Sequence, residues 1–217
     1  MLTRIYHIIR KDFLVGKRER QAFLASLLYL VAITFVVFKV FGTLEGPTRM
    51  GVFWIIMVFI SINLVGYSFS LVSDRRRLNH YQLYDPVEFL LAKLLTNIFK
   101  LIVAGILLIG LFMLFSAQGL KNAALFTQIY LLASFGLVGV LTFVSSIAVY
   151  SSNQMSMVTI LSLPLLIPVM MIGMRVSLVS ERMFFDTSTG NSLLMLFGID
   201  LLMVVLSVLF ISFTWKP

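Results

Sequence analysis

The chain has 217 residues, of which 60% are hydrophobic and 12% are charged, and its formal net charge is +8. A soluble domain of this length cannot bury so large an apolar fraction, because burial rises only slowly with chain length. The composition therefore excludes an ordinary soluble protein and indicates a membrane protein, and the lack of cysteine excludes disulfides, thiol redox chemistry and cysteine-ligated iron–sulfur clusters.

Long apolar runs recur along the chain, and several reach the roughly 20 residues that a helix needs to cross about 30 Å of hydrocarbon. Hydrophobic residues do not alternate with the period of a strand, so transmembrane helices are predicted and a barrel is not. We expect an all-α, polytopic membrane protein with a single transmembrane domain over residues 1–217. Its six predicted spans lie at about residues 22–41, 52–72, 98–115, 125–150, 157 onward and 193–213.

Residues 1–20 precede the first apolar run and have a pattern of their own. Leu2, Ile5, Ile9 and Phe13 recur at helical spacing, and lysines and arginines fill the other side. This pattern predicts an amphipathic helix that lies in the headgroup region. The first apolar run lacks the small-residue pattern of a cleavage site, so we expect it to remain as the first span.

Residues 73–92 form a long polar stretch between the second and third predicted spans. Lysines and arginines near the spans number eleven on the side that carries this stretch and both termini, against five on the other side. By the positive-inside rule, the termini and the stretch 73–92 are predicted to be cytoplasmic, and residues 174–191 to form an outer loop. Topology and anionic lipid, rather than nucleic acid, then account for the positive net charge.

Polar residues within the predicted spans are candidate functional groups. Asp200 lies near mid-membrane, where a carboxylate is costly and usually faces a bundle interior. It either has a functional role or is protonated or hydrogen-bonded to a serine or Asn63 on a neighbouring helix, and the sequence leaves both open. Lys93, Asn97 and Lys100 form a stripe at the start of the third span and are expected to snorkel toward the headgroups.

Two prolines, Pro164 and Pro168, lie inside the fifth predicted span. Each removes a backbone donor from the helix, and the pair therefore predicts a bend. Such a bend would lie near the outer loop and would give this helix some compliance.

The sequence lacks the common catalytic patterns. It contains no HExxH, no GxSxG, no pair of intramembrane aspartates, and no GxxxxGK followed by Ser or Thr. We therefore expect no catalytic residues, and no ATP hydrolysis by this chain alone. His7 and His80 are both predicted to be cytoplasmic, so haem would have no histidine ligand within the membrane, and we expect neither a metal nor a cofactor on this chain.

Two segments resemble known families. Residues 81–87, YQLYDPV, followed by Lys93, are similar to the coupling segment of ABC-2 type permeases. Residues 160–168, ILSLPLLIP, resemble the LPLxIP signature of haem exporter protein B, the CcmB family of cytochrome c maturation. Chain length, the six spans and the basic N-terminus extend this resemblance over the whole chain. The stretch 74–80, DRRRLNH, departs from the acidic residues and glycine that often precede the coupling turn in that family.

The resemblance implies a permease subunit of the bacterial inner membrane that works as a homodimer. Its implied partners are an ABC ATPase (CcmA-like), a haem-handling membrane protein (CcmC-like) and a periplasmic haem chaperone (CcmE-like). ATP would bind to the partner, and its hydrolysis would drive haem export or release of the haem-loaded chaperone. The residues implied in ATPase coupling are Asp74, Arg75, Arg76, Arg77, Tyr84, Asp85 and Pro86.

Other interpretations remain open from the residues. The arginines at 75–77 could bind anionic lipid instead of an ATPase. The chain could serve an ABC-2 exporter of another cargo, such as a drug, a glycan or a lipid, or it could be a non-transporting membrane scaffold. An exporter of another cargo predicts an ATPase partner without haem proteins, and a scaffold predicts no dependence on an ATPase.

Overall fold

The computed structural model describes residues 17–44, 46–66, 86–116, 119–148, 151, 153–181 and 189–214, and every regular element in these ranges is an α-helix. Six of these helices are long and apolar enough to cross a membrane. This confirms the prediction of an all-α protein with six transmembrane helices. The helices are α2 (Lys17–Phe41), α3 (Gly46–Gly66), α5 (Pro86–Ser116), α6 (Ala123–Ala148), α7 (Gln154–Ser180) and α8 (Thr189–Thr214).

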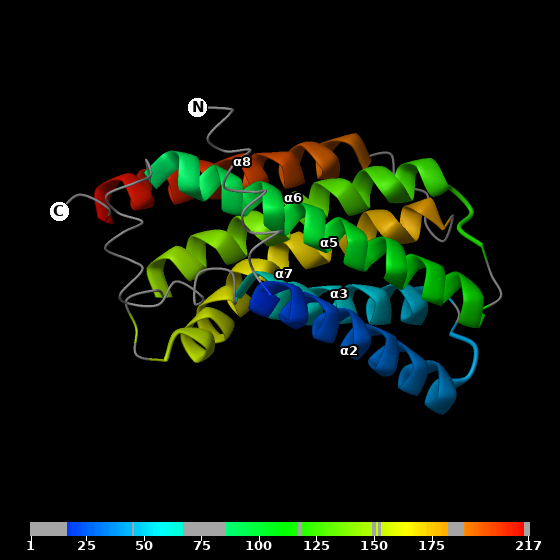
Figure 1. Ribbon diagram of the computed structural model, residues 1–217. Helices are drawn as coiled ribbons and strands as arrows, with labels where there is room; N and C mark the ends of the chain where they lie inside the picture. The colour runs from blue at the N-terminus through cyan, green and yellow to red at the C-terminus, as the bar shows by residue number, and fades with distance from the viewer. Residues whose placement is uncertain are drawn as a thin grey trace.

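Successive helices lie side by side and alternate in direction, so the helix termini collect at two ends of the bundle (Figure 1). One end, here called the Arg49 end, holds the last residues of α2, α5 and α7 and the first residues of α3, α6 and α8. The other end, here called the Pro86 end, holds the remaining helix termini. The predicted topology places the Arg49 end on the outer side of the membrane and the Pro86 end in the cytoplasm.

Helices α3 and α6 form the centre of the bundle. In each of them 72% of the residues in the most apolar stretch are buried inside the protein, whereas in α2 only 17% are buried. Helix α6 packs against α3, α5, α7 and α8, and α2 lies at the periphery against α3 and α5. The outward faces carry large apolar side chains such as Leu28, Leu114 and Ile160, which suit contact with lipid.

The helices extend beyond the predicted spans. Helix α5 begins at Pro86, so residues 86–92, predicted as part of the coupling loop, are instead helical. Proline is favoured at the first helical position because its missing N–H needs no partner there, and Glu88 places negative charge in the first turn. The predicted outer loop at 174–191 is also shorter, because residues 174–180 complete α7 and residues 189–191 begin α8.

The second predicted span starts earlier in the structure as well. Helix α3 begins at Gly46, six residues before the predicted start. Hydropathy identifies only the apolar part of a helix, whereas backbone hydrogen bonding continues into flanking polar residues. Residues 1–16 of the predicted amphipathic helix and residues 67–85 lie outside the described residues, and residues 17–20 belong to α2.

A glycine sets the contact between α5 and α6. A Cβ atom at Gly105 would overlap the ring of Tyr130, whose hydroxyl donates a hydrogen bond of 2.7 Å to the carbonyl oxygen of Leu101. In lipid, helices associate through such close packing and through hydrogen bonds between helices. Gly110, one and a half turns further along α5, is exposed and has nothing within 4 Å of the corresponding position.

We expect Gly105→Leu to destabilise the protein and Gly110→Leu to leave it stable. The leucine at 105 must displace the Tyr130 ring, and overpacking of this kind costs about 1–3 kcal/mol. The same residue at 110 faces lipid. Thermal stability in mild detergent, followed by size-exclusion chromatography of heated samples, measures both variants. An equal loss of thermal stability in the two variants would contradict this account of the α5–α6 contact.

Candidate functional site

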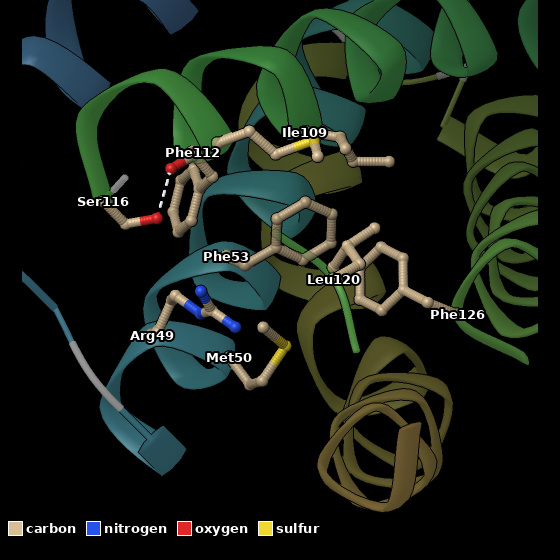
Figure 2. A pocket seen from close by; sticks show the side chains of 9 residues that line it. Arg49, Met50, Phe53, Ile109, Phe112, Ser116, Leu120 and Phe126 are labelled. Carbon is tan, nitrogen blue, oxygen red and sulfur yellow. Dashed lines mark hydrogen bonds between the residues drawn. The ribbon is translucent and has the colours of Figure 1, made fainter. Parts of the chain in front are cut away.

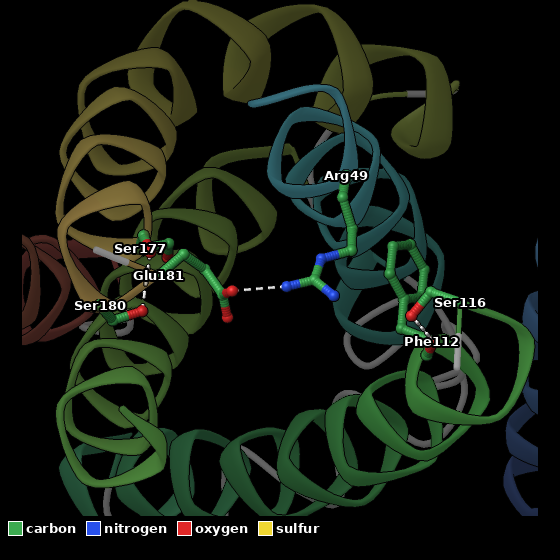
Figure 3. A network of polar contacts seen from close by, with 6 residues as sticks. All are labelled: Arg49, Phe112, Ser116, Ser177, Ser180 and Glu181. Carbon is green, nitrogen blue, oxygen red and sulfur yellow. Dashed lines mark hydrogen bonds and ion pairs between the residues drawn. The ribbon is translucent and has the colours of Figure 1, made fainter. Parts of the chain in front are cut away.

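Two opposite charges are buried at the Arg49 end. Arg49, in the first turn of α3, donates a hydrogen bond from Nη2 to Oε2 of Glu181 at 2.6 Å. Arg49 is 4% exposed, and Glu181, directly after α7, is 1% exposed. Figure 3 shows the pair reaching across the space between α3 and α7. The ion pair therefore ties together the ends of two helices that are far apart in sequence.

The contact between α3 and α7 continues from the ion pair toward the Pro86 end. The indole nitrogen of Trp54 donates to the hydroxyl of Ser177 at 3.0 Å, and that hydroxyl donates to the carbonyl oxygen of Gly173 at 2.7 Å. A Cβ atom at Gly173 would lie 2.8 Å from the indole ring, so the glycine admits Trp54 against the backbone of α7. We call Arg49, Glu181, Trp54, Ser177 and Gly173 the α3–α7 clamp.

A small aromatic-lined cavity adjoins the clamp between α3, α5 and α6 (Figure 2). Its volume is about 20 Å³, which is room for about one water molecule. The rings of Phe112 and Phe126 both meet Phe53 edge to face, with centroids 5.6 and 5.4 Å away. Typical ligand pockets are far larger, at about 300–1,000 Å³. This cavity is therefore too small to serve as such a pocket.

The intramembrane carboxylate Asp200 lies near the middle of α8 and is 6% exposed. Neither carboxyl oxygen has a hydrogen-bond partner among the described residues. The hydrogen bond to a serine or Asn63 that the sequence left open is not formed there. The Asn63 amide donates instead to the carbonyl oxygen of Phe59 on its own helix. Asp200 therefore faces the bundle interior, and the described part of the chain supplies it with no hydrogen-bond partner.

The polar stripe on α5 lies inside the protein. The sequence predicts that Lys93, Asn97 and Lys100 snorkel toward the headgroups, whereas all three side chains are buried within the protein. The difference arises because this face of α5 is covered by neighbouring helices, which hydropathy cannot reveal. The Lys93 ammonium lies 5.8 Å from the ring centroid of Phe89, one turn nearer the Pro86 end.

The two prolines of the fifth span lie on α7, which is a continuous helix from Gln154 to Ser180. Both Pro164 and Pro168 are exposed, as are Ile160 and Met171. A spacing of four residues puts the prolines on one face of the helix. That face is directed away from the other helices of this chain.

The residues predicted to couple to an ATPase lie almost entirely outside the described residues. This applies to Asp74, Arg75, Arg76, Arg77, Tyr84 and Asp85. Pro86 is the first residue of α5. The buried stripe of Lys93, Asn97 and Lys100 thus belongs to the same helix that directly follows the predicted coupling segment.

The α3–α7 clamp was not predicted from the sequence, although a signal for it exists. Arg49 directly precedes an apolar run and Glu181 follows another one. The predicted topology places both on the same side of the membrane. Opposite charges at adjoining ends of two spans indicate a possible ion pair, but only the packing identifies the two helices as neighbours.

Breaking the ion pair on one side should destabilise the Arg49 end. We expect Arg49→Met or Glu181→Leu alone to cost about 3–5 kcal/mol, because each leaves an uncompensated buried charge. The double variant should recover most of that loss. Unfolding in detergent measures the four proteins of this double-mutant cycle, and Lys121→Met at an exposed site is the control. Additive losses in the double variant would contradict a direct interaction.

Comparison with known proteins places the chain in a family. Residues 3–172 match the family model of the ABC-2 type transporter. The matched stretch includes α3, α5, α6 and most of α7, together with the predicted coupling segment. No curated protein and no solved structure matches this chain. Since the match covers well over half of its residues, the chain belongs to the ABC-2 type transporter family of membrane proteins.

Proposed function

We propose that this protein is the permease subunit of an ABC-type complex in cytochrome c maturation. The family identifies the chain as the transmembrane component of an ABC transporter, which is not itself catalytic, and implies an ABC ATPase as partner. The observation that carries the finer assignment is the segment 160–168, which resembles the signature of haem exporter protein B. In the complex, ATP hydrolysis by the partner drives haem export or release of the haem-loaded periplasmic chaperone.

The bundle favours a mechanical role for a single copy of this chain. The cavity beside Arg49 has a volume of about 20 Å³, too small for a cofactor of the size of haem. Helix α5 runs from the Pro86 end to the Arg49 end, so a push at one end can reach the other through a rigid element. In this proposal haem is a cargo of the assembled complex rather than a cofactor held by this chain.

In this proposal the α3–α7 clamp is the part that responds to the ATPase. Movement of residues 73–85 displaces the start of α5 at Pro86, and α5 transmits that displacement toward Ser116. Ser116 and Phe112 line the cavity that also contacts Arg49. The face of α7 with Pro164 and Pro168 offers compliance where this displacement reaches the clamp.

The proposed assembly contains two copies of this permease and two of a CcmA-like ATPase in the bacterial inner membrane, with both termini cytoplasmic. A CcmC-like haem-handling protein and a CcmE-like periplasmic chaperone complete it. The charge distribution of the sequence supports this orientation.

Co-purification in mild detergent tests the assignment. We expect this chain to retain a stoichiometric ABC ATPase together with a haem-handling membrane protein, because the mechanism requires both. Mass spectrometry of the intact complex gives the stoichiometry. An ATPase without haem proteins would favour an exporter of a drug, a glycan or a lipid. Recovery of neither class would favour a scaffold, and either result would contradict the proposed function.

Charge reversal in the coupling segment tests the coupling step. We expect Arg75→Glu, Arg76→Glu and Arg77→Glu together to reduce ATP turnover of the complex to the rate of the isolated ATPase. Lys121→Glu, an exposed change at the Arg49 end, should leave turnover unchanged. Unchanged ATPase binding and turnover in the triple variant would indicate that these arginines bind lipid instead.

A further inference from the structure

The surroundings of Asp200 are closely packed and apolar. A Cβ atom at Gly136 on α6 would collide with Oδ1 of Asp200, and the side chain of Val169 on α7 lies 3.1 Å from the same position. The carboxyl group therefore occupies a niche that the missing side chain of Gly136 leaves between α6, α7 and α8. Three helices enclose it, and one turn along α6 a Cβ atom at Gly139 would lie 3.4 Å from Cβ of Met203 on α8.

No cation compensates this carboxyl group within the described part of the chain. Both of its oxygens lack a hydrogen-bond donor there. A metal ion would need several oxygen ligands, and the described residues include no cluster of three or more histidine, aspartate or glutamate side chains that could bind one. An unpaired carboxylate in such a site costs far more than a neutral carboxyl group. A proton is therefore the occupant that this geometry accommodates.

The charged and titratable side chains on the helices around α8 do not compensate Asp200 either. Tyr130 of α6 is directed toward α5, where it binds Leu101. Glu181 at the end of α7 is held by Arg49. None of these groups hydrogen-bonds to Asp200. Six charged or titratable residues lie on the described parts of α5, α6 and α7 or directly after α7. They are Glu88, Lys93, Lys100, Tyr130, Arg175 and Glu181.

We propose that Asp200 is a proton-binding site whose occupancy holds α8 against α6 and α7. In this packing the carboxyl group carries the proton. When α8 separates from α6 and water enters, the O–H bond gives its proton to water and a hydrated carboxylate remains. The packed arrangement is thereby linked to pH. The inference does not depend on the cargo or on the identity of the ATPase.

The proton at Asp200 makes the stability of the packed state depend on pH in one direction only. A proton bound in the packed state and released in the open or unfolded state stabilises the packed state at low pH, and this stabilisation is lost as pH rises. One proton changes the ratio of unfolded to folded protein by at most about tenfold for each unit of pH. Asp200→Asn keeps the shape of the side chain and cannot release a proton, so this contribution should disappear.

Unfolding by sodium dodecyl sulfate in mild detergent micelles, from mildly acidic to mildly alkaline pH, tests the proposal. We expect the wild-type protein to lose stability with rising pH and D200N to lose distinctly less. Lys121→Gln, an exposed change of charge, should retain the wild-type dependence. Equal pH dependence in wild type and D200N would overturn the proposal, as would a wild-type stability that does not fall with rising pH.

Infrared spectroscopy observes the proton directly and remains decisive if D200N fails to assemble. At neutral pH the intact wild-type protein should show the C=O stretching band of a protonated carboxyl group in an apolar site. The band should be absent from D200N and should be retained in Lys121→Gln, an exposed change that leaves the surroundings of Asp200 intact. A wild-type spectrum without a protonated carboxyl band at neutral pH would overturn the proposal.

Discussion

Close approach of helices at three glycines is the interaction on which this bundle depends. Gly105 admits Tyr130, Gly173 admits Trp54, and Gly136 admits Asp200, so each glycine accepts a side chain with a polar tip from another helix. Hydrophobic burial does little to join helices in lipid, because lipid tails are as apolar as leucine. Packing against bare backbone and polar contacts between helices take its place.

The three contacts differ in how the polar tip is satisfied. Tyr130 bonds to a carbonyl oxygen of α5 and Trp54 bonds to Ser177 of α7. Asp200 has no such partner among the described residues. Since buried polar groups are nearly always hydrogen-bonded, the exception needs a physical cause. This contrast within one bundle, rather than the presence of a charge in a helix, distinguishes Asp200 from ordinary packing residues.

The two ends of the bundle are built differently. At the Arg49 end, a buried ion pair and an indole hydrogen bond join α3 to α7 beside a cavity that holds about one water molecule. Toward the Pro86 end, Lys93, Asn97 and Lys100 line one buried face of α5. The continuous helices α5 and α7 connect the two ends.

Sequence alone determined the class of protein, the number of spans and their order, because hydropathy over about 20 residues responds directly to the thickness of the bilayer. It also located Asp200 and the two prolines, which stand out against apolar neighbours. Tertiary structure alone decided that Arg49 meets Glu181, that Gly136 makes room for Asp200, and that the lysine stripe faces protein. Hydropathy assigns each residue a depth in the membrane, whereas partners are set by how each helix is rotated and which helices adjoin it.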